Sequence, residues 1–207
     1  MGLFTASAPV ALHPVSPPVG VFSQYCMQVP TTLVLKERAF SFSGDDFAIK
    51  DSNGMVVARC QGKSFSFKDR KVITDPNGQL LFGLRNKLLS IHKTYIAEDQ
   101  GENEIFRVRS KLALGTKMIA TFVNKSTNAP ITLELRGDFW GGSADISIEG
   151  GPVIAQISRK LFNARELFVS KQTYFVTVAP GVDLALISAV CICFDEFKND
   201  SNNNGGS

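Results

Sequence analysis

The sequence predicts a mainly β fold of the α+β type: a closed antiparallel barrel of about twelve strands around a buried hydrophobic C-terminal helix. Three observations lead to this prediction. Apolar and polar residues alternate with a period of two through most of the chain, the pattern of strands with one dry and one wet face. Two Asn-Gly turns separate matching strand pairs. One apolar run near the C-terminus breaks the alternation and is apolar on every helical face.

Both ends of the chain are expected to be flexible. Residues 1–24 contain four prolines and no periodic apolar pattern, so we interpret them as a disordered, dispensable leader. Residues 199–207 are polar and rich in Asn and Gly, which predicts a disordered tail. Residues 25–198 are assigned to one barrel domain, because 207 residues suffice for one substantial core.

The strand signals begin with the run at residues 31–36 and continue around two hairpins. Asn53-Gly54 and Asn77-Gly78 lie 24 residues apart and favour turns because both residue types tolerate a positive φ. Further strand signals cover residues 64–68, 88–97, 104–111, 117–124, 131–137, 144–149, 152–158 and 174–179. One-sided alternation over so many strands implies closure into a barrel or a sandwich.

The apolar run covers residues 184–194, in which Ser188 is the only polar residue. A transmembrane helix needs about 20 apolar residues, and shorter runs are typical of core helices. We therefore predict no transmembrane span but a core helix that fills a barrel too wide for its own side chains. Asp183 stands where a carboxylate favours the start of a helix.

The cysteines and the N-terminus indicate the compartment. Cys26, Cys60, Cys191 and Cys193 form no C-x-x-C pair, which favours buried free thiols in a reducing compartment. The first charged residue is Lys36, so the basic segment of a signal peptide is missing. These features predict a cytoplasmic protein, and a peripheral association with the plasma membrane is compatible with them.

Four segments resemble one family of proteins. They are Val72–Phe82, of the form T-D-x-N-G-x-L-L-F; Leu89–His92; Val153–Lys160, which is similar to I-V-A-Q-x-x-R-K; and Phe175–Asp183 followed by Ala185 and Ile187. Together they resemble the LURP-one-related family, in the tubby C-terminal-like superfamily that also includes phospholipid scramblases. The resemblance covers residues 25–197 and implies a twelve-stranded barrel around a central C-terminal helix.

The resemblance also implies a range of functions. Members of the family are linked to plant defence and stress responses, and tubby relatives bind phosphoinositides through basic residues on the barrel exterior. The resemblance assigns no basic residue of this chain to that role. For His92, which lies in one of the matching segments, it implies a structural hydrogen bond.

No constellation of catalytic residues is visible in the sequence. The two histidines, His13 and His92, have no identifiable nucleophile or carboxylate partner. Gly62-Lys63-Ser64 resembles the end of a P-loop, but Val57 stands where the first glycine is required. We therefore predict no enzyme, no catalytic residue, no metal site and no cofactor. The net charge of +3 is too small to predict nucleic-acid binding.

Basic residues suggest a surface site. Arg107, Arg109 and Lys111 alternate with apolar residues, so they share the outer face of one strand at intervals of about 7 Å. Such a row is either a solvated strand face or a site for anionic lipid headgroups. The lipid-binding candidates are Arg107, Arg109, Lys111, Arg159, Lys160 and Arg165.

The leading hypothesis for function is a module that docks reversibly on phosphoinositide membranes or on a protein partner, in stress or defence signalling. The first alternative is a protein-interaction scaffold that does not bind lipid. A scramblase-like membrane protein is a weaker alternative, because the apolar run is short for a membrane span.

Overall fold

The computed structural model describes residues 11–36, 47–62, 70–87, 90, 92–113, 116–138, 143–158 and 173–203. These residues form twelve strands, one short 3-10 helix (η1, Ser23–Tyr25) and one α-helix (α1, Leu184–Asn203). The strands are β1 Thr31–Lys36, β2 Phe47–Asp51, β3 Val56–Gly62, β4 Arg70–Thr74, β5 Leu80–Asn86, β6 Thr94–Glu98, β7 Glu104–Ala113, β8 Thr116–Val123, β9 Pro130–Asp138, β10 Ser143–Ile148, β11 Val153–Ser158 and β12 Thr173–Val178.

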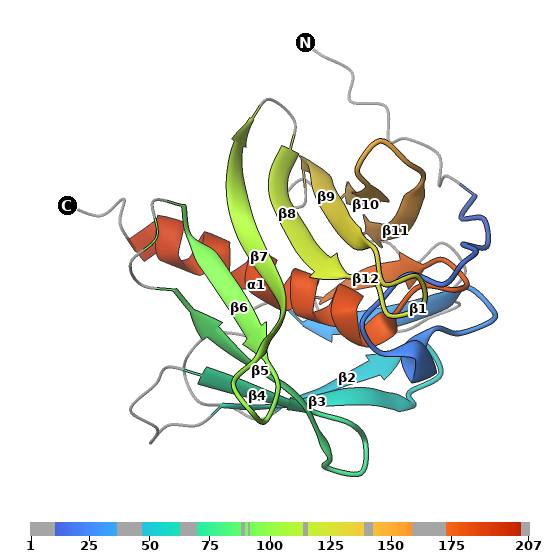
Figure 1. Cartoon of the computed structure of the whole chain (residues 1–207), viewed down its shortest axis with the longest axis horizontal. Coiled ribbons are helices and arrows are strands. Elements are labelled where there is room, and N and C mark those ends of the chain that lie inside the picture. Colours follow the sequence, from blue (N-terminus) through green and yellow to red (C-terminus); the bar gives the residue numbers. More distant parts are fainter. Residues whose placement is uncertain are drawn as a thin grey trace.

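The strands close into one antiparallel barrel, as the sequence predicts. Each strand pairs with its neighbours in the chain, and β12 pairs with β1 to complete the ring. Figure 1 shows α1, in red, running through the middle of this ring. The turns β2–β3, β4–β5, β6–β7, β8–β9 and β10–β11 lie at the end where β1 begins and β12 leads into α1. We call this the entry end of the barrel.

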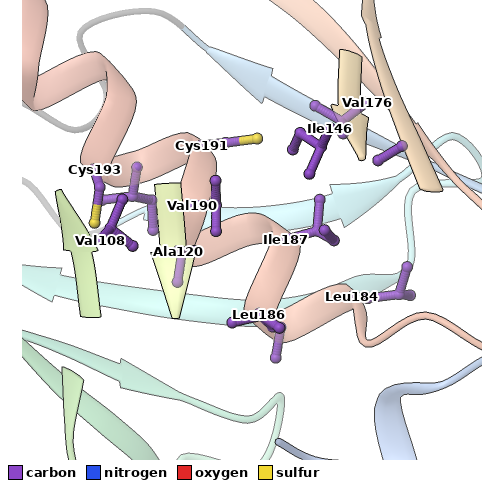
Figure 2. Close-up of a cluster of buried hydrophobic side chains, with 14 of the residues drawn as sticks. Val108, Ala120, Ile146, Val176, Leu184, Leu186, Ile187, Val190, Cys191 and Cys193 are labelled. Atoms are coloured by element: carbon purple, nitrogen blue, oxygen red, sulfur yellow. The ribbon is translucent and has the colours of Figure 1, made fainter. Parts of the chain in front are cut away.

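The predicted core helix is confirmed. Every residue from Leu184 to Phe194 is buried, and the hydroxyl of Ser188 donates to the carbonyl oxygen of Leu184 (2.7 Å). Figure 2 shows helix side chains beside strand residues such as Val108 and Ala120 of the barrel wall. The helix is buried on all sides because the inward positions of the strands are themselves apolar.

Asp183 fixes the start of the helix. Its side chain is fully buried, and Oδ1 accepts from the backbone N–H groups of Ala185 (2.8 Å) and Leu186 (3.1 Å) as a helix N-cap. Oδ2 accepts from the backbone N–H groups of Val21 (3.0 Å) and Phe22 (2.8 Å). One carboxylate therefore ties the start of α1 to the N-terminal leader.

The leader differs from the sequence prediction over residues 11–24, which pack across the entry end. Val19 is buried and forms a parallel bridge with Val182, while the Phe22 ring stacks on Phe82 inside the barrel (centroids 6.0 Å apart). The backbone N–H of Gly20 donates to Asn124 Oδ1 (2.9 Å). The sequence did not reveal this packing for two reasons. The partners lie more than 50 residues away in the chain, and an irregular segment can pack on the barrel without the apolar periodicity that identifies strands and helices. Residues 1–10 lie outside the described part.

The C-terminal end also differs from the prediction, because the backbone of residues 199–203 continues α1. The first glycine after the apolar run is Gly205, so no strong helix breaker precedes residue 203. Residues 204–207 are outside the described ranges.

The two predicted Asn-Gly turns are present, and a third turn repeats their geometry. Gly54 (φ 83°) and Gly78 (φ 88°) have the positive φ that these turns require. At the same 24-residue spacing, the carboxylates of Asp51, Asp75 and Asp99 accept the N–H group four residues later, at 2.8, 2.7 and 2.9 Å. The third turn lies between the strand signals at residues 88–97 and 104–111, and its Asp99-Gln100-Gly101 carries no Asn-Gly pair to mark its type.

A charge in the helix should unfold the domain. We expect Val190→Asp to lower the free energy of unfolding by several kcal/mol, because an unpaired carboxylate would be buried in the lumen. The matched control is Val123→Asp, which places the same group at an exposed position and should change stability by less than about 0.5 kcal/mol. Urea denaturation followed by circular dichroism measures both, and equal stability of the two variants would contradict a buried helix.

Asp183→Asn should destabilise the protein in a pH-dependent way. An amide can accept from only one of the two N–H pairs, and each buried donor left without an acceptor costs about 1–3 kcal/mol. Burial raises the pKa of Asp183 to about 6, against the opposing effect of its four N–H donors. The folded wild type therefore binds this proton more tightly than the unfolded chain, and its stability gains as the pH falls from 7 towards 4.

The difference in unfolding free energy between wild type and Asp183→Asn should accordingly widen over that pH range. Denaturation of both proteins at pH 7, 6, 5 and 4 measures it. If the difference narrows on acidification, the four hydrogen bonds lower the pKa of Asp183 by more than burial raises it, and the prediction is wrong.

Candidate functional site

Strand β7 presents its cations outward, as its alternation predicts. Phe106 and Val108 are buried inside the barrel, whereas Arg109 is exposed and the Arg107 and Lys111 side chains are partly exposed. The three predicted cations of this strand therefore lie on the exterior, but their electrostatic surroundings differ.

Arg107 is held by a carboxylate. Its Nε and Nη2 donate to the two oxygens of Glu104, at 2.6 and 2.7 Å. This hydrogen-bonded pairing lowers the pKa of Glu104. Glu104 is the first residue of β7, and its carboxylate occupies the guanidinium group of Arg107. Arg107 is therefore less available to an external anion than the sequence indicates.

Lys111 shares a carboxylate with an arginine that the sequence reasoning missed. Arg136 on β9 donates to Glu134 Oε2 from Nη2 (2.6 Å) and Nε (3.2 Å). Lys111 Nζ lies 3.5 Å from Glu134 Oε1, so its side chain reaches from β7 across β8 to β9. Arg136 belongs to the alternating run at residues 131–136 and faces outward with Glu134; that alternation was its only signal in the sequence.

Arg109 has no ion-pair partner in the described part of the chain. Its register partner on β8 is Ile119, which in turn pairs with Glu134 on β9. Lys111 and Arg136 thus pair with Glu134, and Arg109 lies across β8 from Glu134 with Ile119 between them. We call these three cations with Glu134 the outer basic face.

The second predicted cluster is not placed. Arg159, Lys160 and Arg165 lie outside the described residues, so their grouping remains a prediction.

A polar cluster lies inside the barrel at the end opposite the entry end. Lys71 on β4 points into the lumen and forms a buried ion pair with Glu196 of α1. Lys93 Nζ lies over the rings of Tyr95 (5.9 Å to the centroid) and Phe197 (5.7 Å), and burial lowers its pKa. Burial also raises the pKa of Tyr95. Lys71, Tyr95 and Glu196 are buried and Lys93 and Phe197 are partly buried, so we assign the cluster to anchoring the part of α1 around Glu196.

The thiols lie in settings that oppose reactivity. Cys60, Cys191 and Cys193 are buried thiols outside any disulfide, and Figure 2 shows Cys191 and Cys193 leaving α1 in different directions. Burial raises the pKa of the Cys193 thiol, although the Lys71 ammonium acts in the opposite direction. Burial raises the pKa of Cys26 to about 11. A thiolate is the nucleophilic form, so these shifts disfavour nucleophilic chemistry at these sites.

The remaining expectations concern metal sites, His92 and membrane spans. Among the described residues, no three His, Cys, Asp or Glu side chains are grouped to hold a metal ion. The carbonyl oxygen of His92 accepts from the Thr94 hydroxyl (2.7 Å), while the hydrogen bond expected for its ring stays a prediction. In the portion of the chain that the structure covers, no helix is long and apolar enough to cross a membrane.

Comparison with known proteins decides the family. A family model described as LURP-one-related matches residues 31–195, which span the barrel and the apolar part of the helix. The chain belongs to the LURP-one-related family. The resemblance seen in the sequence motifs is thereby confirmed.

Relatives of this LURP-one-related chain occur in plants and bacteria. Protein LURP-one-related 15 of Arabidopsis thaliana is 24% identical over 189 residues, covering 88% of this chain and 87% of its own. Protein LURP-one-related 14 of the same plant is 25% identical, covering 88% and 93%. The uncharacterized protein YxjI of Bacillus subtilis (strain 168) is 24% identical over 163 residues, covering 79% and 91%.

A solved structure supports the same fold. The X-ray structure of an Arabidopsis thaliana protein matches 86% of this LURP-one-related chain and 97% of its own, with a TM-score of 0.60 and 21% identity. At this identity the likeness concerns the fold alone.

The buried ion pair gives a test of the interior. We expect Lys71→Met to cost about 3–5 kcal/mol of stability, because it leaves the Glu196 carboxylate buried without its partner. The double variant Lys71→Met with Glu196→Leu should recover most of the loss, since both charges are then removed. Urea denaturation of the wild type, both single variants and the double variant measures the coupling. Additive effects would contradict a direct buried pair.

Proposed function

We propose that this LURP-one-related protein is a non-enzymatic module that docks reversibly on phosphoinositide-containing membranes through the outer basic face. The observation that carries the proposal is that Arg109, Lys111 and Arg136 lie on the outer side of β7 and β9, where Lys111 and Arg136 share a single carboxylate. We further propose that it is a cytoplasmic protein that meets the membrane peripherally, and that this docking serves stress or defence signalling. The free, buried cysteines support a reducing compartment.

The charge of the face suits weak and reversible docking. Each Lys or Arg near an anionic leaflet adds about 1 kcal/mol, and the attraction fades within a Debye length. Three cations partly offset by one carboxylate would therefore bind weakly and in a salt-dependent way.

The raised pKa values of the Cys26 and Cys193 thiols support a role without covalent chemistry.

A second candidate function is a protein-interaction scaffold that does not bind lipid. Val29, just before β1, and Met55, after the β2–β3 turn, are exposed apolar side chains at the entry end. The backbone N–H of Ser52 in that turn donates to the carbonyl oxygen of Thr32 in β1 (2.8 Å), so the two segments are neighbours. Exposed apolar residues of this kind favour contact with another protein.

Removing the three charges should weaken membrane binding. We expect the variant Arg109→Gln, Lys111→Gln and Arg136→Gln to float less on phosphoinositide-containing liposomes and to lose much of the salt dependence. Glutamine keeps hydrogen-bond donors near the covered Glu134, and a thermal melt of the variant establishes that the barrel is intact at the temperature of the flotation experiment. The measurement is liposome flotation at low and physiological salt, on phosphoinositide-containing and on neutral liposomes.

The matched control removes three exposed cations elsewhere, by Lys50→Gln, Arg59→Gln and Lys125→Gln on β2, β3 and the β8–β9 turn. It should float like the wild type. If wild type floats on neither kind of liposome, the lipid proposal is wrong and the scaffold gains support. If both variants float equally well, docking occurs at another site, for which Arg159, Lys160 and Arg165 are the next candidates.

A further inference from the structure

Glu134 stands out on the outer basic face because it is covered while its partners are exposed. The Glu134 side chain is 6% exposed, whereas those of Arg136 and Lys111 are 56% and 38% exposed. The carboxylate therefore lies beneath the two cations that face solvent. Their proximity lowers its pKa, so Glu134 remains ionised at neutral pH.

The contacts of Glu134 fix two cations at once. Both Nε and Nη2 of Arg136 are directed at Oε2, which defines the plane of the guanidinium group. Oε1 accepts a hydrogen bond from the ammonium group of Lys111 on β7, two strands away. Ile119, which lies between Arg109 and Glu134 in the register, is 4% exposed although it is on the barrel exterior. The side chains around this position therefore form a packed layer.

The Arg107–Glu104 pair on the same strand is different. Both of its side chains are well exposed, and they are only three residues apart in the chain. The pair is bidentate, but it fixes a single cation of β7 and connects no second strand. Glu104 of β7 thus has one partner on its own strand, whereas Glu134 of β9 pairs with Arg136 on its own strand and with Lys111 on β7.

We propose that Glu134 is a positioning residue that holds Lys111 and Arg136 in place for a multiply phosphorylated lipid headgroup. The inference rests on the proposed membrane docking. It assigns to Glu134 the role of fixing the cations so that they distinguish one kind of headgroup from other anionic lipids. Long Lys and Arg side chains lose conformational entropy when a ligand orders them. Because Glu134 has already ordered two of them, a headgroup that needs several cations in a fixed arrangement meets a smaller entropic cost.

The ligand class follows from this arrangement. A phosphomonoester carries a charge of about −1.5 to −2 and three acceptor oxygens, so one group can contact more than one cation. Arg109 has no carboxylate partner in the described ranges, and Arg136 and Lys111 keep N–H groups that Glu134 does not occupy. Phosphatidylserine in a fluid leaflet is attracted mainly by the number of cations, so it gains little from their fixed positions.

Substitution of Glu134 distinguishes the effect of the net charge of the outer basic face from the effect of the fixed positions of its cations. Glu134→Ala adds one positive charge to the face but releases Arg136 and Lys111. Glu104→Ala adds the same charge on the neighbouring part of β7 and leaves those two cations held. If only charge mattered, both variants would bind every anionic vesicle more tightly, and the more highly charged headgroup would gain the most.

The experiment measures partition onto vesicles that contain a phosphatidylinositol bisphosphate and onto phosphatidylserine vesicles of equal net charge. We expect Glu134→Ala to bind phosphatidylserine vesicles about fivefold more tightly, the change that corresponds to ~1 kcal/mol for one charge. The ratio of bisphosphate to phosphatidylserine binding should fall about fivefold, which corresponds to ~1 kcal/mol for ordering a released side chain. Glu104→Ala should not lower this ratio. Glu134→Gln, which keeps an acceptor for Arg136, should restore part of it.

The outcomes distinguish this inference from the proposed function. If wild type binds neither vesicle, the docking proposal fails, and the inference fails with it. If wild type binds and Glu134→Ala raises the ratio as Glu104→Ala does, docking stands but Glu134 is only a counter-ion, which overturns the inference. Thermal melts of all variants show whether the barrel is intact, and Glu134→Gln provides the comparison if the alanine variant is unstable.

Discussion

Burial of a helix that is apolar on every side is the constraint on which the rest of this structure depends. The eleven residues from Leu184 to Phe194 cannot face water on any side, so they need a complete wall of apolar partners. A ring of twelve strands provides this wall, and the helix in turn fills a lumen that strand side chains alone would leave too wide. The helix and the barrel therefore stabilise each other, and neither is a reasonable folding unit without the other.

Polar groups inside the lumen must also be paired, and the pairing occurs on either side of the apolar run of α1. At the entry end, Asp183 accepts four backbone N–H groups, two from the first turn of α1 and two from the leader. At the other end, Lys71 of the wall neutralises Glu196 of the helix. Buried charges are tolerated only with such partners, so these contacts set the position of α1 along the barrel axis.

Because α1 occupies the lumen, the proposed function uses the exterior. The exterior of β7 to β9 shows that a row of cations in a sequence is not a uniform surface. Arg107 is occupied by Glu104, Arg109 has no carboxylate partner among the described residues, and Lys111 shares Glu134 with Arg136. These differences decide which cations can meet an anion, and they arise from neighbours on other strands or turns.

The sequence by itself determined the features that depend on local patterns. Alternation placed Phe106 and Val108 inside and Arg109 outside, and Asn-Gly pairs placed the turns at Gly54 and Gly78. The length of the apolar run distinguished a core helix from a membrane span. Each of these inferences needs only residues within one strand, turn or helix, whose periodicity is fixed by backbone geometry.

Only the tertiary structure decided which distant residues meet. The register of β7, β8 and β9 brought Arg136 beside Lys111, and the inward direction of Lys71 gave Glu196 its partner. The same holds for the leader, whose buried Val19 and Phe22 contacts depend on Asp183, more than 150 residues away. Periodicity gives the face on which a side chain lies, but the pairing of strands far apart in the chain determines its neighbours.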